Sequence, residues 1–278
     1  MIDLSNLFSI CSEVVDVVEQ EASEIPERSL KFRNPAQVHT KSSIGDVITE
    51  LDRKVEANLI RRLGKVIPTS RVIGEEYGQH GHGSTNWVID PIDGSTNVLH
   101  GMPHAAVSVA LCEGSSARIG VVHNPFNGKT YYATSEGGAF VHTAGTPVDK
   151  HRDQRIQVSP NSLLSQSLLG FGLPYDRDRS EEIFSAASRA FSRCQDLRRR
   201  GSAALDIISV ATGELDGYFE LDLRVWDVAA AELILREAGG LLTSWGGDDL
   251  EWDTSENKFD VLATNTSVHS ALQRVLVE

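Results

Sequence analysis

Apolar residues recur at three- and four-residue steps in several parts of the chain, the spacing that puts them on one face of an α-helix. The stretch from Leu4 to Val18 shows this spacing most clearly. Residues 228–238 form a second clear case, and the two glycines that follow are expected at a helix C-terminus. The same spacing predicts helices over residues 52–63, 181–193, 202–212 and 268–277.

Short segments of alternating apolar and polar residues follow one another in the middle of the chain. Turn sequences such as Asn127-Gly128 and Gly137-Gly138 separate them, so we expect an antiparallel meander of strands. Its strands are predicted at residues 104–112, 117–123, 130–133 and 139–142. Other strands are predicted at residues 71–76, 87–89, 167–172, 217–221, 241–245 and 259–263, and loops at residues 23–43 and 79–85.

The order of these elements bounds the fold class. Helices and strands mix without strict alternation, which favours a layered α+β fold. At 278 residues the chain is long enough for one large domain or for two closely packed halves. The polar and charged segment 146–157 is the best boundary, so we expect an N-terminal half at residues 1–150 and a C-terminal half at residues 151–278.

Net charge and cysteine usage narrow the classes of partner and compartment. The chain has 39 Asp and Glu against 26 Lys and Arg, a formal charge of −13, which argues against sequence-independent binding to nucleic acid or to an anionic membrane. Cys11, Cys112 and Cys194 form no CxxC pair, which suits a reducing compartment. The sequence shows neither the basic segment of a signal peptide nor an apolar run of the ~20 residues that span a bilayer, so we expect a cytoplasmic protein.

The chain is organised around residues 87–97, WVIDPIDGSTN. Its first three residues are apolar and predict the end of a buried strand, and Asp90 and Asp93 follow on a turn that the adjacent proline and glycine force. The last three residues are good N-cap types, so a helix would begin here with free backbone N–H groups. Two carboxylates beside a helix start suit a divalent cation and a phosphate side by side. An ordinary surface turn of Asp, Pro and Gly is the alternative.

Acidic residues also stand at the ends of other predicted elements, at Asp52, Glu75 and Asp227. Taken singly, Asp52 and Asp227 could simply cap their helices. Taken together with Asp90 and Asp93, they predict an all-oxygen site for Mg²⁺ or Mn²⁺, because clustered carboxylates repel one another unless cations join them. The sequence contains no HExxH or Cys/His cluster, which argues against zinc. Such a site can transfer a phosphoryl group to a metal-activated water without a nucleophilic side chain.

Three ordered motifs match a known family: residues 74–76 (GEE), residues 87–97, and residues 226–240, which begin WDVAAAE. On these motifs the chain resembles, over nearly its whole length, the inositol monophosphatase family of Mg²⁺-dependent, lithium-sensitive phosphatases. Residues 46–52 and 200–206 also stand in the expected order. The resemblance implies a layered αβαβα sandwich of the inositol monophosphatase / fructose-1,6-bisphosphatase type. It also implies two to three Mg²⁺ ions, with Mn²⁺ as a substitute, and a homodimer, which the family commonly forms.

Carried over residue by residue, the resemblance implies the ligands of these metal ions. A first ion would be held by Glu75, Asp90 and the carbonyl of Ile92. A second would be held by Asp90, Asp93 and Asp227, and a looser third ion would lie near Glu75.

The resemblance also implies how water and substrate are held. Asp52 and Ser95 would activate the attacking water; the family often has Thr in place of Ser95, and the hydroxyl is kept. Ser95 could instead serve only as an N-cap. The backbone of Gly94 and Ser95 would bind phosphate, with Lys41 near it. The substrate-binding residues that the resemblance implies are Lys41, Ile92, Asp93, Gly94, Ser95, Gly201, Ser202, Ala203, Glu220 and Asp227.

Several substrates and roles stay open at this point. Glu220 suits a polyol, since a carboxylate accepts hydrogen bonds from hydroxyl groups, and this favours inositol monophosphate. Relatives with a similar metal core hydrolyse fructose 1,6-bisphosphate, histidinol phosphate or the 3′-phosphate of adenosine 3′,5′-bisphosphate, which remain alternatives. Some bacterial relatives act as regulatory binding proteins on the same fold, an alternative of a different class. The run Arg198, Arg199 and Arg200 is either a phosphate clamp or a solvated basic run.

Overall fold

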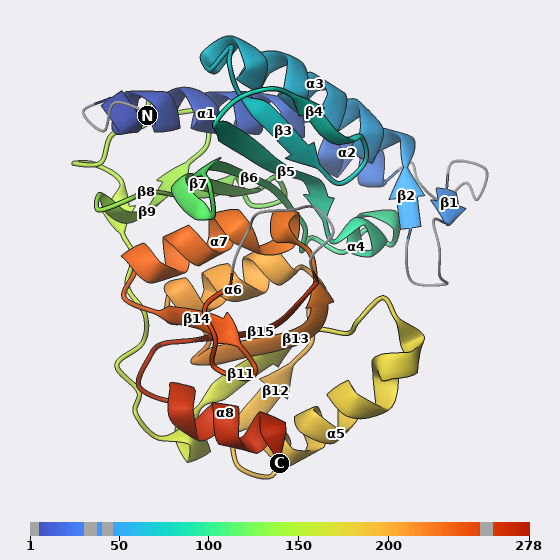
Figure 1. Ribbon diagram of the computed structural model, residues 1–278, viewed down its shortest axis with the longest axis vertical. Helices are drawn as coiled ribbons and strands as arrows, with labels where there is room; N and C mark the ends of the chain where they lie inside the picture. The colour runs from blue at the N-terminus through green and yellow to red at the C-terminus, as the bar shows by residue number, and fades with distance from the viewer. Residues whose placement is uncertain (1–5, 31–37, 41–46, 251–257) are drawn as a thin grey trace.

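An eight-stranded sheet forms one layer of the molecule, and its centre is the predicted antiparallel meander (Figure 1). The computed structural model describes residues 6–30, 38–40, 47–250 and 258–278. The strand order is β10-β9-β8-β7-β6-β5-β3-β4, with β3 and β5 parallel and the other neighbours antiparallel. The strands are β3 (Arg71–Gly74), β4 (Gly78–Gly81), β5 (Thr85–Asp93), β6 (Ala106–Glu113), β7 (Ser116–Asn124), β8 (Lys129–Thr134), β9 (Gly138–Thr143) and β10 (Gln154–Arg155).

A second, five-stranded sheet is built from the C-terminal part of the chain. Its order is β12-β11-β13-β15-β14, with β11 parallel to both β12 and β13. The short edge strand β12 had no signal in the hydrophobic pattern and was not predicted. The strands are β11 (Leu168–Phe171), β12 (Asp196–Arg198), β13 (Gly217–Leu223), β14 (Leu241–Ser244) and β15 (Phe259–Thr264).

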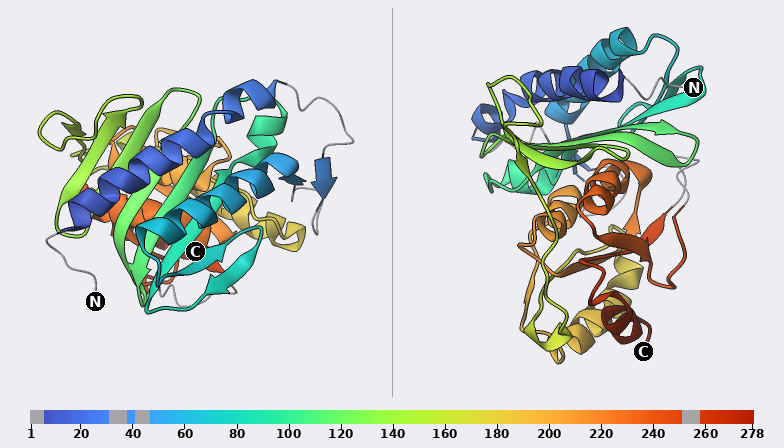
Figure 2. Two further views of the ribbon diagram at one scale, coloured as in Figure 1. Left: turned by 90° about the horizontal axis from the view of Figure 1, so that it is seen from above. Right: turned by 90° about the vertical axis from the view of Figure 1, so that its left-hand side faces the viewer.

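Helices cover both faces of both sheets, which gives the predicted αβαβα sandwich (Figure 2). Helices α1 (Leu7–Ala22) and α3 (Glu50–Val66) lie on the outer face of the large sheet. Helices α6 (Ala203–Ala211) and α7 (Val225–Glu237) lie between the sheets, and all of α6 is buried for this reason. Helices α5 (Ser180–Phe191) and α8 (His269–Val277) lie on the outer face of the small sheet.

Three short elements lie where the sequence pattern predicted loops, so those loop predictions are wrong there. They are β4, α2 (Ile25–Ser29) and β1 (Val38–Thr40). The partner strand of β1, β2 (Val47–Thr49), lies after the predicted loop, in the stretch that leads into the predicted helix. Strand β4 is a mostly exposed edge strand without apolar alternation, and α2 has only five residues. Elements this short carry too few residues for a period of two or 3.6 to show.

One apolar core joins the two sheets through α6 and α7. It contains Val88 and Ala110 of the large sheet together with Tyr218 and Val261 of the small sheet. Helix α7 approaches the large sheet closely, because a Cβ atom on Gly120 would lie only 2.5 Å from the carbonyl oxygen of Ala230. This core contains residues from both sides of residue 150. The division of the chain into two halves near residue 150 therefore stays a prediction.

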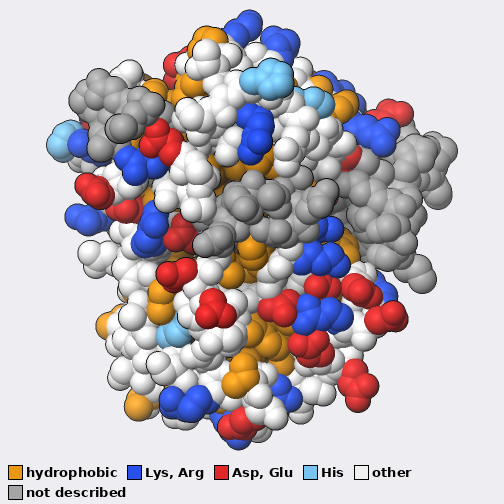
Figure 3. Space-filling model, in the orientation of Figure 1, with side chains coloured by type: hydrophobic (Ala, Val, Ile, Leu, Met, Phe, Trp, Pro, Cys, Tyr) orange, Lys and Arg blue, Asp and Glu red, His pale blue; other side chains and the backbone are white. Residues whose placement is uncertain are grey.

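Charged side chains of both signs lie on the surface. On the face seen in Figure 3, basic side chains are interspersed with acidic ones. Among the residues that the structure describes, no helix is long and apolar enough to cross a bilayer.

Candidate active site

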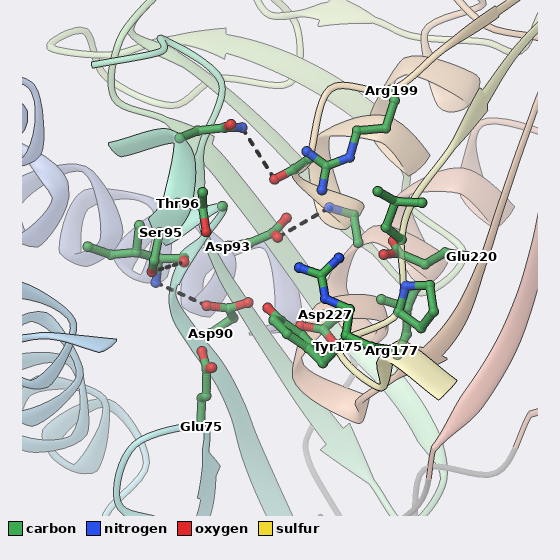
Figure 4. Close-up of a pocket in the computed structure, with 18 residues that line it drawn as sticks. Glu75, Asp90, Asp93, Ser95, Thr96, Tyr175, Arg177, Arg199, Glu220 and Asp227 are labelled. Atoms are coloured by element: carbon green, nitrogen blue, oxygen red, sulfur yellow. Dashed lines mark hydrogen bonds between the residues drawn. The ribbon is translucent and has the colours of Figure 1, made fainter. Parts of the chain in front are cut away.

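A polar pocket lies where the ends of β3, β5 and β13 meet the first turns of α6 and α7 (Figure 4). Most of the residues predicted from the sequence line it. These are Glu75, Asp90, Ile92, Asp93, Gly94, Ser95, Gly201, Ala203, Glu220 and Asp227. Asp52 and Ser202 contact this set directly, as described below. Lys41 lies outside the described residues.

The central stretch is a strand with a bulge, and the predicted turn after Ile89 is wrong. Strand β5 continues through Asp93, with Asp90 opposite Ser108 and Asp93 opposite Ala106. From one of these pairs to the next, β5 advances by three residues and β6 by only two, so β5 contains a bulge. Such a bulge changes the direction in which the side chains of the bulged strand point. Both carboxylates line the pocket as a result.

The helix predicted after the bulge is present but short. Helix α4 (Ser95–Leu99) begins behind Gly94, which takes the N-cap position with a φ of 95°. Only glycine adopts this conformation without strain. The three polar residues after Gly94 lie inside the helix and make no N-cap hydrogen bond, contrary to the prediction that they would cap it.

Asp52 and Ser95 form a hydrogen-bonded pair across 43 residues of sequence. The Ser95 hydroxyl donates to the carboxylate of Asp52, in the first turn of α3. Its oxygen also lies 2.9 Å from the carbonyl oxygen of Ile92. A hydroxyl has a single proton, so one acceptor receives it at a time. The pair has the arrangement expected of a hydroxyl that passes a proton to a carboxylate.

Glu56, which sequence reasoning did not single out, holds the turn that carries Glu75. Its fully buried carboxylate accepts hydrogen bonds from the backbone of Glu76, at 2.8 Å, and of Tyr77, at 3.0 Å. A Cβ atom on Gly74 would lie 2.1 Å from this carboxylate. Gly74 therefore leaves the space that Glu56 fills, which explains the glycine of the GEE motif.

Asp90 and Asp227 face each other in the pocket. Burial, together with the charges of Glu75, Asp93 and Asp227, raises the pKa of Asp90 well above its usual value. Burial and Asp93 likewise raise the pKa of Asp227, which is partly offset by a backbone hydrogen bond of 2.6 Å from Arg224. No described Lys or Arg forms an ion pair with either carboxylate.

Asp93 connects the large sheet to α6. Its carboxylate accepts hydrogen bonds from the Ser202 hydroxyl at 2.6 Å, the Ala204 backbone at 2.7 Å and the Ala203 backbone at 3.2 Å. Burial raises its pKa, and these hydrogen bonds oppose the rise. Asp93 thus caps a helix that begins 110 residues later, in addition to lining the pocket.

Glu220 projects from β13 into the other side of the pocket. It is 9% exposed and accepts a hydrogen bond from the hydroxyl of Tyr218, two residues earlier on the same face of the strand. Burial raises its pKa well above the usual value. Gly172 leaves room for it, because a Cβ atom there would lie 2.0 Å from the Glu220 carboxylate.

Several lining residues were missed by sequence reasoning. Leu173, Pro174, Tyr175 and Arg177 come from the segment after β11, which showed no periodic pattern. Half of the Tyr175 surface is exposed, yet its hydroxyl end lies among the carboxylates, and burial and their charges raise its pKa. Only the proline and the charged residues of this segment could have indicated a functional loop. Such residues are also common in loops without a function, so they did not single this segment out.

The chemistry of the donor set fits divalent cations. Asp90 and Asp227 are buried carboxylates whose pKa is raised by burial and by neighbouring carboxylates, and oxygen ligands of this kind suit Mg²⁺ or Mn²⁺. Among the described residues, no three His, Cys, Asp or Glu side chains already stand in metal-binding geometry. The fit therefore rests on the donor types and their shared pocket.

The chain is similar to known proteins over most of its length. A profile of the inositol monophosphatase family matches residues 11–278. The inositol-1-monophosphatase of Synechocystis sp. is 35% identical over 243 residues, which cover 86% of this chain and 80% of that protein. The Nus factor SuhB of Xylella fastidiosa is 34% identical over 235 residues, 84% of this chain and 82% of that protein.

Solved structures show the same fold. The extragenic suppressor protein suhB of Bartonella henselae superposes with a TM-score of 0.86 at 29% identity, over 96% of this chain and 98% of that chain. The inositol monophosphatase of Anabaena superposes with a TM-score of 0.81 at 30% identity, over 98% of this chain and 96% of that chain.

Proposed function

The chain belongs to the inositol monophosphatase family, and on that premise we propose that it is a Mg²⁺-dependent phosphomonoesterase acting on a small phosphorylated polyol. The observation that carries the proposal is the meeting of three buried carboxylates with the Asp52–Ser95 pair in one pocket. Asp90 and Asp93 come from the end of one strand, β5, and Asp227 comes from the start of α7, far from them in sequence.

The metal ligands proposed are those that the family resemblance implies. Glu75, Asp90 and the Ile92 carbonyl would hold one ion, and Asp90, Asp93 and Asp227 a second, with a third near Glu75. When bound, such ions lower the pKa of a coordinated water and neutralise the leaving oxygen.

The protein's own groups then orient the water and the substrate. The Ser95 hydroxyl accepts a proton from the water as it passes its own to the Asp52 carboxylate, which then holds the proton as a neutral carboxylic acid. The backbone of Gly94 and Ser95 receives the phosphate at the start of α4, where N–H groups have no partner inside the helix. Lys41 keeps the role near the phosphate that the resemblance implies.

The opposite side of the pocket receives the polyol. Glu220 accepts hydrogen bonds from ring hydroxyls with the carboxylate oxygen that Tyr218 leaves available, and Gly201 and Ala203 border the same space, while Ser202 acts there through its hydrogen bond to Asp93. This arrangement supports inositol monophosphate as the substrate. Fructose 1,6-bisphosphate, histidinol phosphate and adenosine 3′,5′-bisphosphate are the alternatives with the same chemistry.

A substrate panel tests the proposal. Phosphate release is measured with and without Mg²⁺ from inositol 1-phosphate and the three alternatives. Mg²⁺-dependent release with a preference for inositol 1-phosphate is the expected result. A preference for another compound of the panel would agree with the proposed metal site but contradict the proposed role of Glu220 in binding inositol. If folded, Mg²⁺-loaded protein releases no phosphate from any of the four compounds, the proposed enzymatic function is wrong.

The names of relatives favour a second candidate role. Similar proteins are named both inositol-1-monophosphatase and Nus factor SuhB, so a regulatory binding protein on this fold is the alternative. Rescue of a deletion phenotype by a catalytically inactive variant would favour this role. A cytoplasmic homodimer is part of either proposal.

A further inference from the structure

Tyr218 and Glu220 form a pair of buried polar side chains on β13. They are two residues apart, so both side chains point to the same face of the strand. The hydroxyl of Tyr218, which is 1% exposed, donates a hydrogen bond to the Glu220 carboxylate. No other group in the described part of the chain donates to this carboxylate. The orientation of Glu220 therefore depends on a single donor.

The neighbouring strand β11 leaves space for this pair. Gly170 stands opposite Tyr218, and a Cβ atom there would lie 3.0 Å from a carbon of the tyrosine ring. Gly172 leaves the space that the Glu220 carboxylate fills, as described above. On the other side of β13, the small side chain of Ala263 stands opposite Tyr218. Glycines within strands often mark such close approaches, and these two form a slot for the ring and the carboxylate.

The Tyr218 ring makes this donor rigid. It belongs to the apolar core that also contains Leu205 and Ile208 of α6, so packing fixes the position of its hydroxyl. A glutamate side chain has several rotatable bonds, and ordering it only when a ligand binds would weaken the binding. The Tyr218 hydroxyl occupies one carboxylate oxygen and leaves the other as an acceptor on the pocket side. An acceptor held in this way selects ligands with hydroxyl groups.

We propose that Tyr218 is a positioning residue that holds Glu220 ready for the ring hydroxyls of the substrate. It thereby sets the selectivity for a phosphorylated polyol over a phosphate ester that has no hydroxyl groups. This inference rests on the proposed function, because it assumes that Glu220 faces the polyol. Tyr218 is not among the described residues that line the pocket, so its effect passes through Glu220.

The test compares inositol 1-phosphate with cyclohexyl phosphate, which has the same ring without the hydroxyl groups. Tyr218→Phe removes only the tyrosine hydroxyl. The KM for inositol 1-phosphate is expected to rise about 5- to 10-fold, with kcat within about 3-fold of wild type, because the Asp52–Ser95 pair and the proposed metal ligands are untouched. The KM for cyclohexyl phosphate should change by less than about 2-fold. Equal rises for both compounds, or no rise for either, would overturn the proposal.

A double-mutant cycle shows whether Tyr218 acts through Glu220. Glu220→Gln alone should raise the KM for inositol 1-phosphate, and adding Tyr218→Phe to it should raise this KM by less than about 2-fold more. Effects that simply multiply would mean that Tyr218 acts independently of Glu220, which contradicts the proposal.

Gly172→Ala tests the same point with Tyr218 intact. Its Cβ atom would lie 2.0 Å from the Glu220 carboxylate and displace it, so the KM for inositol 1-phosphate should rise selectively. This variant also decides the question if Tyr218→Phe does not fold. An unchanged KM in folded Gly172→Ala would show that the orientation of Glu220 does not matter.

Tyr132→Phe is the matched control. Tyr132 is also 1% exposed and donates to a carboxylate, that of Asp153, at 2.8 Å, but neither residue lines the pocket. The variant should lose stability without changing the ratio of the two KM values. A change in this ratio as large as that in Tyr218→Phe would attribute both effects to general destabilisation and overturn the proposal.

Calorimetric binding of the same two compounds adds a readout that does not depend on turnover. It is made with Ca²⁺, which supplies charge without the tight octahedral geometry of Mg²⁺. Weaker binding of inositol 1-phosphate alone in Tyr218→Phe supports the proposal, and equal binding by wild type and variant overturns it. If the wild type releases phosphate from none of the compounds but the selective loss of binding is present, the proposed function alone is wrong. If it hydrolyses inositol 1-phosphate and Tyr218→Phe changes nothing, only the role of Tyr218 is wrong.

Discussion

The hydroxyl of Ser202 donates a hydrogen bond of 2.6 Å to the carboxylate of Asp93, across 109 residues of sequence. The same hydroxyl caps α6 by accepting from the backbone of Leu205, at 3.4 Å. One side chain therefore fixes both the start of a buried helix and the orientation of a proposed metal ligand. We therefore expect the stability of α6 and the proposed catalytic activity to depend on the same side chain.

Replacement of this hydroxyl tests the coupling. Ser202→Ala is expected to lower the free energy of unfolding by about 1–2 kcal/mol, because α6 loses its cap and Asp93 loses a donor. The kcat/KM for the best substrate should fall as well, since Asp93 is no longer held. Urea unfolding and phosphate release measure the two effects. Ser192→Ala, at an exposed serine after α5, is the control, and an unchanged unfolding free energy in Ser202→Ala would contradict the capping role.

Asp90 is a sharper target for the metal site than Asp93, because Asp93 also caps a helix. In the metal-free protein Asp90→Asn should raise the melting temperature, since it removes one of several mutually repelling buried charges. The variant should lose the rise in melting temperature that Mg²⁺ produces in the wild type, and at least about 100-fold of the activity. Thermal unfolding with and without Mg²⁺ measures this. Asp16→Asn, on the exposed side of α1, should keep the full Mg²⁺ effect, and retention of that effect by Asp90→Asn would rule out Asp90 as a ligand.

Glu56 offers a test of how the Glu75 turn is held. Glu56→Gln exchanges one acceptor oxygen for an amide that faces the backbone N–H groups of Glu76 and Tyr77. The expected result is a loss of about 1–3 kcal/mol in unfolding free energy and a higher Mg²⁺ concentration for half-maximal activity. Glu50→Gln, exposed at the start of the same helix, is the matched control. A Mg²⁺ requirement identical to that of the wild type would show that the turn does not depend on Glu56.

His123 predicts a pH dependence of stability away from the site. It is 3% exposed, its Nδ1 lies 2.8 Å from the Thr130 hydroxyl, and burial, with His142 nearby, lowers its pKa to about 4. Thr130 in turn donates to Glu19 at 2.5 Å, so the ring faces a carboxylate only through this hydroxyl. In the unfolded chain a histidine titrates near pH ~6.5.

Between about pH 6.5 and pH 4 the unfolded chain therefore binds a proton that the folded protein excludes. The contribution to stability is complete above pH ~6.5 and is lost, by up to about 1.4 kcal/mol per pH unit, as the pH falls toward 4. Urea unfolding at pH 7.5 and pH 5 measures the loss. His123→Gln should reduce the difference between the two pH values, whereas His151→Gln, at an exposed histidine, should leave it as in the wild type.

Local patterns predicted most of the architecture. The helices α1, α3, α5, α6, α7 and α8 and the meander of β6 to β9 lie where the spacing of apolar residues placed them, with ends shifted by a few residues. The elements that were not predicted, such as β4 and β12, are short, exposed or at a sheet edge. Their stability comes from pairing with a neighbouring strand, and no periodic pattern within the segment reports it.

The acidic chemistry of the site was also visible in the sequence, because Asp90, Asp93 and Asp227 stand in motifs whose residue types suit oxygen ligation. Which partners hold these groups was decided only by the tertiary structure. Sequence distance hides two of these contacts, the hydrogen bond of Ser202 to Asp93 and that of Glu56 to the backbone of Glu76. The ion pair of Arg200 with Asp206 is hidden because Arg200 stands in a run of three arginines. The run of three arginines shows the reason. Its members are equivalent as sequence, and only the positions of Asp196 and Asp206 in the folded protein leave Arg199 directed into the pocket.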